Sequence, residues 1–275
     1  MKKTILLLII AFSLCTINKA MAQEASGTTG DCTWELTGTS GEYTLTVSGS
    51  GAMGDYSYDY IANITNTPWW DYKDNIKTVI IEDGVTTIGI YSFYQFENLE
   101  TVTIGENVET IGDYAFYGCH SLTSAVIGEN VTAIGRSAFY MCHSLTGALI
   151  IPGLVMSIGD WTFYGCRNLT SVTIGNSVTT IGERAFYNCT GLISVIIGNS
   201  VTSIEELAFY NCTGLTNVYI KRQSPPWLGD NVFLDIPTNS ALHIPCVAKD
   251  AYQGATGWKD FTYYIEDVPL TGTTG

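Results

Sequence analysis

The chain contains 275 residues, of which 46% are hydrophobic and only 14% are charged. An apolar share of this size supports a buried core and excludes an intrinsically disordered chain. With 26 acidic against 12 basic residues, the formal net charge is −14. This balance argues against nucleic acid and anionic membrane surfaces as partners, because like charges repel.

The first 22 residues have the three parts of a secretory signal. Lys2 and Lys3 give a positive start, residues 5–14 form an apolar run, and residues 20–22 (Ala-Met-Ala) match the small-x-small cleavage pattern. The apolar run is too short for a membrane span, which needs about 20 residues. We therefore expect an exported protein of bacterial type, secreted or on the cell surface. It would begin at Gln23, with no membrane span after cleavage.

Residues 23–72 carry strand patterns that differ from everything that follows. Two alternating stretches, Cys32 to Leu36 and Tyr43 to Val47, are separated by the turn-forming residues 37–41 and predict a β-hairpin. The segment from Gly49 to Trp70 is rich in Gly, Tyr and Asp and joins this hairpin to the rest of the chain. We interpret residues 23–72 as an N-terminal β-rich cap region.

Residues 73–245 contain an internal repeat of 23 or 24 residues, which predicts a solenoid. In each unit, an alternating stretch such as Thr101 to Ile104 predicts a short strand, and Gly105 to Asn107 predicts a turn. The spacing of Ala115, Cys119 and Leu122 predicts a short helical return. Because no unit can bury its apolar side alone, we expect about eight parallel strands to stack. The phenylalanines that mark the phase are Phe93, Phe116, Phe139, Phe163, Phe186, Phe209 and Phe233.

Two departures from the repeat stand out. The fourth unit has one extra residue near Gly147, which we expect to form a bulge or loop that leaves the stack intact. Residues 246–275 lose the repeat and contain Trp258 and Phe261. Since a solenoid must cover its open ends, we interpret residues 246–275 as a C-terminal cap and tail.

The repeats resemble a known family. The runs Ile111 to Cys119 (IGDYAFYGC) and Ile181 to Cys189 (IGERAFYNC) are similar to the BspA-type leucine-rich repeat. This resemblance implies an α+β repeat solenoid, a right-handed leucine-rich-repeat superhelix with an N-terminal β-hairpin cap. It also implies an adhesion or interaction protein of the cell surface. The family offers no catalytic residues to transfer.

The cysteines could carry chemistry, but a structural role is favoured. Five of them recur in repeat phase, either as small buried side chains or as partners in disulfides between units. Cys119-His120 and Cys142-His143 could in principle hold zinc, but adjacent side chains point in different directions. No nucleophile elbow or phosphate loop is present. We therefore expect no enzyme, no metal and no cofactor. The five cysteines are Cys119, Cys142, Cys166, Cys189 and Cys212.

Two rows of repeat-phase residues are candidate surfaces. Tyrosines directly after the core phenylalanines, from Tyr94 to Tyr210, either form a recognition surface or seal the edge of the core, and we favour sealing. Outward strand positions on a free face should be mostly polar, yet four in the other row are Ile or Val. That row is a candidate protein-binding face, although strand propensity alone could explain it. It comprises Ile80, Thr103, Val126, Ile150, Thr173, Ile196 and Tyr219.

These patterns together predict an exported leucine-rich repeat protein that binds an extracellular or host protein through the strand face. The alternative is a glycan-binding accessory protein of the cell surface that uses Trp and Tyr side chains as platforms.

Overall fold

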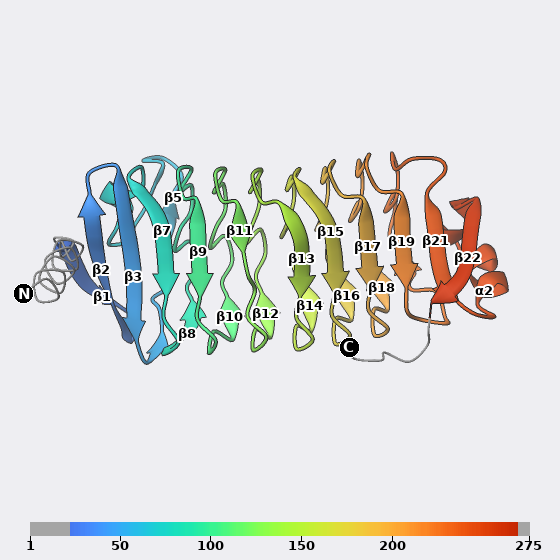
Figure 1. The fold of residues 1–275 in the computed structure, drawn as a ribbon, viewed down its shortest axis with the longest axis horizontal. Helices are drawn as coiled ribbons and strands as arrows, with labels where there is room; N and C mark the ends of the chain where they lie inside the picture. Colours follow the sequence, from blue (N-terminus) through green and yellow to red (C-terminus); the bar gives the residue numbers. More distant parts are fainter. Residues whose placement is uncertain (1–22, 269–275) are drawn as a thin grey trace, which may run out of the picture.

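The computed structural model describes residues 23–268, in which the chain forms an elongated parallel β-solenoid (Figure 1). The signal predicted for residues 1–22 and the tail after residue 268 lie outside this range. Within residues 23–268, no helix has the length and apolar character that a membrane crossing requires. About eight turns stack along one axis, as the repeat predicts.

Each turn contributes one strand to a front ladder, which we define as the parallel strands β7 to β21 that follow the predicted row from Ile80 to Tyr219. Neighbouring strands pair in register, for example Ile150 with Thr173 and Ile196 with Tyr219. Side chains alternate, so that Val195 and Ile197 of one strand are buried while Ser194 and Ile196 are only partly covered. The front strands are β7 (Ile76–Ile81), β9 (Thr101–Ile104), β11 (Ser124–Ala125), β13 (Gly147–Ile151), β15 (Leu169–Ile174), β17 (Ser194–Ile197), β19 (Asn217–Ile220) and β21 (Ala241–Pro245).

A second parallel ladder, the back ladder, forms one continuous sheet of eight short strands. Its isoleucines stack in register, as Ile111 does on Ile134 and Ile158 on Ile181. The back strands are β4 (Gly51–Ala52), β8 (Val85–Ile88), β10 (Thr110–Ile111), β12 (Ala133–Ile134), β14 (Ser157–Ile158), β16 (Thr180–Ile181), β18 (Ser203–Ile204) and β20 (Trp227–Leu228).

The short helical return predicted from Ala115, Cys119 and Leu122 is wrong. The segment after each back strand, here called the return segment, is a run of tight turns. Every second backbone N–H donates to the next turn of the solenoid, as those of Tyr114, Phe116 and Gly118 do at 2.8 to 2.9 Å. The residues between them, such as Ala115 and Tyr117, donate instead to the carbonyl three residues earlier, so bonds between turns alternate with single tight-turn bonds and no helix continues. Ala115, Cys119 and Leu122 are all buried, so these turns place the i, i+4, i+7 apolar positions in the core without forming a helix.

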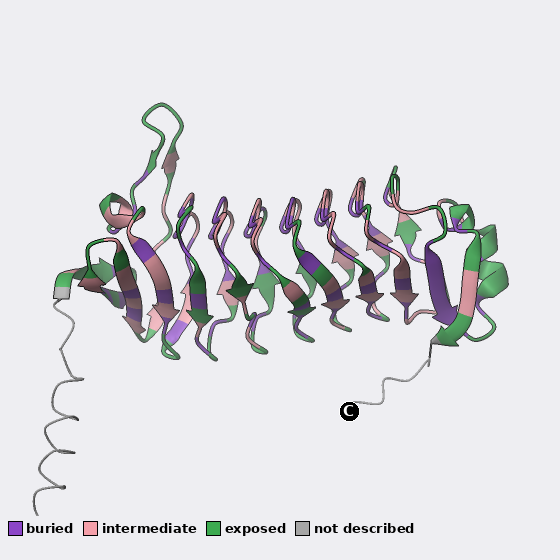
Figure 2. Cartoon of the chain, turned by 45° about the horizontal axis from the view of Figure 1, so that its top comes forward, coloured by how far each residue is buried: buried purple, intermediate pink, exposed green. Residues whose placement is uncertain are grey.

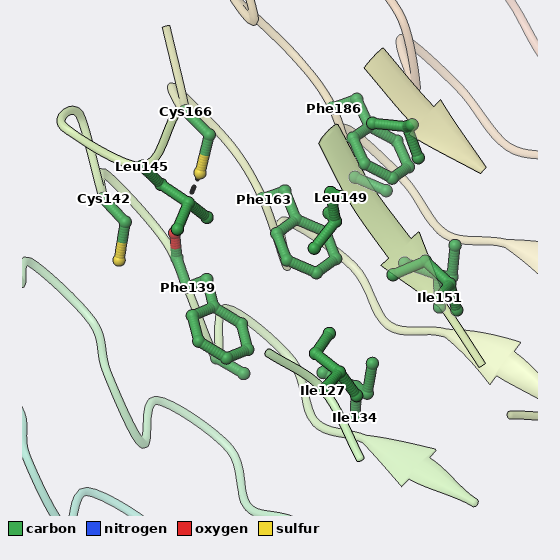
Figure 3. Close-up of a cluster of buried hydrophobic side chains, with 14 of the residues drawn as sticks. Ile127, Ile134, Phe139, Cys142, Leu145, Leu149, Ile151, Phe163, Cys166 and Phe186 are labelled. Atoms are coloured by element: carbon green, nitrogen blue, oxygen red, sulfur yellow. Dashed lines mark hydrogen bonds between the residues drawn. The ribbon is translucent and has the colours of Figure 1, made fainter. Parts of the chain in front are cut away.

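The core is a column of phenylalanine rings that runs through the stack, and Figure 3 shows its middle part, Phe139, Phe163 and Phe186. Successive rings from Phe93 to Phe233 lie 5.2 to 5.5 Å apart between centroids and are close to parallel. Each ring from Phe93 to Phe209 is fully buried. This column is what the repeat-phase spacing predicts, and it spans the turn that carries the extra residue.

The front ladder, in contrast, is interrupted at that turn. Strand β11 pairs with β9 and strand β13 pairs with β15, but among the described residues no strand pairing joins β11 to β13. The extra residue makes a bulge at Gly147, whose φ of +80° favours glycine. The core therefore stays intact, as expected, whereas the break in the front ladder is a feature that the sequence did not indicate.

Both ends of the stack are covered. The predicted N-terminal hairpin is present as β2 (Cys32–Thr39) and β3 (Glu42–Gly49); β1 (Gln23–Thr29) pairs with β2, and β3 continues the front ladder beside β7. A small hairpin, β5 (Tyr58–Asp59) and β6 (Ile64–Thr65), stands away from the stack (Figure 2) and precedes the 3-10 helix η1 (Trp70–Tyr72). At the other end lie α2 (Lys249–Gly254), η2 (Trp258–Asp260) and β22 (Tyr263–Val268).

Candidate binding face

The predicted row lies along the front ladder, on the side of each strand away from the core. The neighbouring residues Val79, Val102 and Leu149 point inward and are buried. Within the row, Thr103, Val126 and Ile150 are exposed, and the other four residues are half-buried. Val126 lies directly after β11, at the break in the ladder. The structure therefore brings the row together on one face, and its most exposed apolar members flank the break.

A hollow of about 180 Å³ occupies this break. Val126 and Ile150 line it from the two sides, with 73% and 59% of their surfaces exposed. Its floor includes Leu145 and Leu149, and Glu129 lies at its rim. A paired ladder would have no such opening, because neighbouring strands lie about 4.8 Å apart. We call this feature the ladder-break hollow.

Charge changes sign along the edge of the front ladder. The turns after the first front strands carry the exposed carboxylates of Asp83, Glu106 and Glu129, and the equivalent position in the later turns holds Asn176 and Asn199. The next turn carries Lys221 and Arg222. None of the three carboxylates is in an ion pair with another described residue. The acidic half of this edge therefore includes the ladder-break hollow.

The tyrosine row packs against itself. Rings from Tyr94 to Tyr210 stack face to face with centroids 4.5 to 4.8 Å apart. Burial raises the pKa of Tyr117 and Tyr140. Since each ring in the middle of the row has a neighbour on both faces, its faces are not free to stack on a sugar. This arrangement favours the sealing role.

The cysteine column is buried in the core. Each Sγ donates to a phenylalanine carbonyl of the preceding turn, as Cys166 does to Phe139 at 3.3 Å (Figure 3). All seven described cysteines are free thiols, including Cys32 and the exposed Cys246. Burial raises the pKa of Cys189 to about 12, which keeps its thiol protonated near neutral pH.

The two Cys-His pairs do not converge. The sulfurs of Cys119 and Cys142 point into the core, while the rings of His120 and His143 stack outside it with centroids 4.9 Å apart. Burial, followed by the neighbouring His120, lowers the pKa of His143. Within residues 23–268, no group of three or more His, Cys, Asp and Glu side chains is arranged to hold a metal ion.

Comparison with known proteins agrees with this architecture. The model of the BspA-type leucine-rich repeat region matches in six copies, over residues 63–150 and 147–252. The chain belongs to the BspA-type leucine-rich repeat family. Among curated proteins, none matches this chain.

Two solved structures show where this family member stands among similar folds. A leucine-rich cell surface protein from Faecalibacterium prausnitzii is 25% identical with a TM-score of 0.55, over 82% of this chain and 71% of that one. A leucine-rich repeat protein from Bacteroides ovatus is 22% identical with a TM-score of 0.59, over 78% of this chain. The match spans 58% of the Bacteroides ovatus protein. Leucine-rich repeat folds of this kind are typically binding scaffolds, which indicates a role in protein interaction.

Proposed function

We propose that this BspA-type protein is exported and attaches to a protein outside the cell through its front ladder. The observation that carries the proposal is the ladder-break hollow, where Val126 and Ile150 expose apolar surface on a strand face. An exposed apolar patch with a polar rim is typical of protein interaction sites. Ser124, Glu129 and Thr146 line the hollow and supply such a rim.

The charge of the edge defines the partner further. Glu129 lines the hollow, and Glu106 and Asp83 lie at the equivalent positions one and two turns before it, all without an ion pair to another described residue. A partner that carries Lys or Arg next to an apolar side chain would therefore be complementary. A long face of repeated positions also allows many weak contacts to act together, which suits adhesion. Membership of a family with a cell-surface relative supports display on the surface.

Binding to immobilised extracellular matrix proteins tests the proposal. We expect Val126→Lys and Ile150→Lys each to weaken binding at least about tenfold, because a charged side chain would replace the apolar contact. Trp227→Lys is the matched control, since Trp227 is 60% exposed but lies on the back ladder. Equal binding by all three variants and the original protein would move the site away from the front ladder.

Export has its own test. Residues 1–22 fused to a reporter enzyme should carry the reporter out of a bacterial cell, and Leu8→Lys should keep it inside because the charge interrupts the apolar run. Retention of the unmodified fusion would contradict export by this segment.

Glycan binding remains the alternative function. The faces of the stacked tyrosines are covered by one another, so the row offers no platform of the size that the alternative requires. The protein-binding proposal therefore has the stronger structural support. Specific binding to a glycan that the Val126→Lys variant retains would favour the glycan-binding function instead.

A further inference from the structure

The return segments form a third ladder of hydrogen bonds, and its last turn is incomplete. In each of six successive turns, three backbone N–H groups at alternate residues donate to carbonyls of the next turn. In the sixth, Leu207, Phe209 and Asn211 donate to Asp230, Val232 and Leu234 at 3.0 Å. In the seventh, the equivalent donors are Asn231, Phe233 and Asp235, and within residues 23–268 none of these three has an acceptor.

The reason is a change of fold at the C-terminal end. After β21, the chain forms α2 and η2 where the next return segment would lie, so no carbonyls are presented to these donors. The cap does cover the end of the core, because Trp258 and Phe261 pack on Phe233 with centroids 5.4 and 5.3 Å away. The ring column is therefore closed, while the backbone at its outer edge remains open.

A cavity of about 440 Å³ lies at this edge. All three donor residues line it, and the apolar side chains of Leu234, Ile236 and Phe261 contribute to its walls. Cavities of roughly 300 to 1,000 Å³ are the usual size of ligand sites. The carboxyl-bearing residues Asp235 and Asp260 also lie in its lining, so the cavity is acidic as well as apolar.

We propose that this cavity, here called the end pocket, binds a peptide segment of a partner protein that adds one more turn to the return ladder. The spacing of the three donors specifies the ligand. Six times in the stack, three N–H groups at alternate residues bond to three carbonyls of the following return segment, so a peptide with the same backbone conformation would fit these donors. Main-chain pairing of this kind supplies affinity, and pockets beside it supply specificity.

The chemistry of the walls specifies the side chains. Leu234, Ile236 and Phe261 suit an apolar residue, and the acids suit Lys or Arg. A free anion is disfavoured by the same acids, because it would meet negative charge in the pocket. The end pocket is separate from the front ladder, so this inference does not depend on the function proposed above.

A peptide taken from the chain itself is the sharpest probe. The probe is residues 180–190 with Cys189→Ser to prevent oxidation. Inside the stack, the carbonyls of Glu183, Ala185 and Tyr187 in this segment accept the three equivalent bonds from the preceding turn. The peptide also brings Arg184 for the acidic walls. Titration into the full chain should slow hydrogen exchange of the Asn231, Phe233 and Asp235 amides at least about tenfold, since they gain acceptors. A scrambled peptide of the same composition should leave exchange unchanged.

A matched pair of variants distinguishes peptide binding in the end pocket from nonspecific binding to exposed apolar side chains. Leu234 in the pocket and Leu154 in the fourth turn are 49% and 51% exposed. We expect Leu234→Ser to weaken peptide binding about tenfold and Leu154→Ser to leave it unchanged. An unshifted Asn211 amide in Leu234→Ser would show that the preceding turn is intact, because Asn211 donates to the backbone of Leu234.

Three results would overturn the proposal. Slow exchange of the three amides in the free protein would mean that they already have acceptors. Equal slowing of amide exchange by the scrambled peptide would mean that binding does not depend on the backbone conformation of the native segment. Protection by inorganic phosphate, with none by the peptide, would make the end pocket an anion site.

Discussion

The front and back ladders are made by the same turns, yet only the front ladder is broken. The back ladder runs as one sheet of eight strands, and the phenylalanine column beside it is continuous. The front ladder divides between β11 and β13, and the hollow with the most exposed apolar residues of the predicted row lies there. At this one turn, stacking therefore rests on the core and the back ladder, which leaves the front face at the break free to vary for binding.

The largest expected effect tests where stability resides. Phe139→Ala, in the column beside the break, should lower the free energy of unfolding by about 3 to 5 kcal/mol, because it leaves a cavity in a fully buried position. Val126→Ala, on the front face of the same turn, should change it by less than about 0.5 kcal/mol. Urea denaturation followed by circular dichroism measures both. Similar losses for the two variants would contradict the division between core and front face.

Glycines at one repeat position provide a finer comparison. A Cβ added to Gly175 would lie 2.3 Å from the Pro152 carbonyl oxygen of the preceding turn, whereas at Gly128 the nearest atom is 3.7 Å away. Gly175→Ala should therefore destabilise the protein by about 1 to 3 kcal/mol through overpacking, and Gly128→Ala should be close to neutral. Equal melting temperatures for the two variants would show that the front turns near the break are packed as tightly as the others.

The sequence indicates the stack but not its irregularities. Phenylalanine spacing predicts the column, because ring packing depends on residue type and phase. The break that accompanies Gly147 is not predicted in this way. It depends on whether the backbone N–H and carbonyl groups of β11 and β13 remain within hydrogen-bond distance. The same is true of Asn231, Phe233 and Asp235, whose side chains do not reveal that their backbone donors lack acceptors. No helix forms after Ala115 because every second backbone N–H of the segment bonds to the next turn, while the tight turns still bury Ala115, Cys119 and Leu122.

Removing the extra residue should repair the front ladder. Deletion of Gly147 returns the fourth unit to 23 residues, so we expect β11 and β13 to pair and the hollow to close. Two or three new hydrogen bonds would stabilise the protein by about 1 to 2 kcal/mol. Hydrogen exchange at Ala125 and Val126 should slow, and binding through the front ladder should weaken. Unchanged exchange at these residues would mean that another feature holds the strands apart.

The cysteine column reports whether the break extends into the core. Cys142 and Cys166 flank the broken turn, and Cys212 lies three turns from Cys142, but all three are fully buried. Burial raises the pKa of each thiol, and only a thiolate reacts readily with iodoacetamide. At pH 8 the exposed Cys246 should be alkylated in the native protein while these three are protected, and all should react in urea. Mass spectrometry of digested peptides measures each site. Faster labelling of Cys142 and Cys166 than of Cys212 would show that the interruption of the front ladder loosens the core behind it. Equal protection of the three thiols would show that the interruption is confined to the face that we propose for binding.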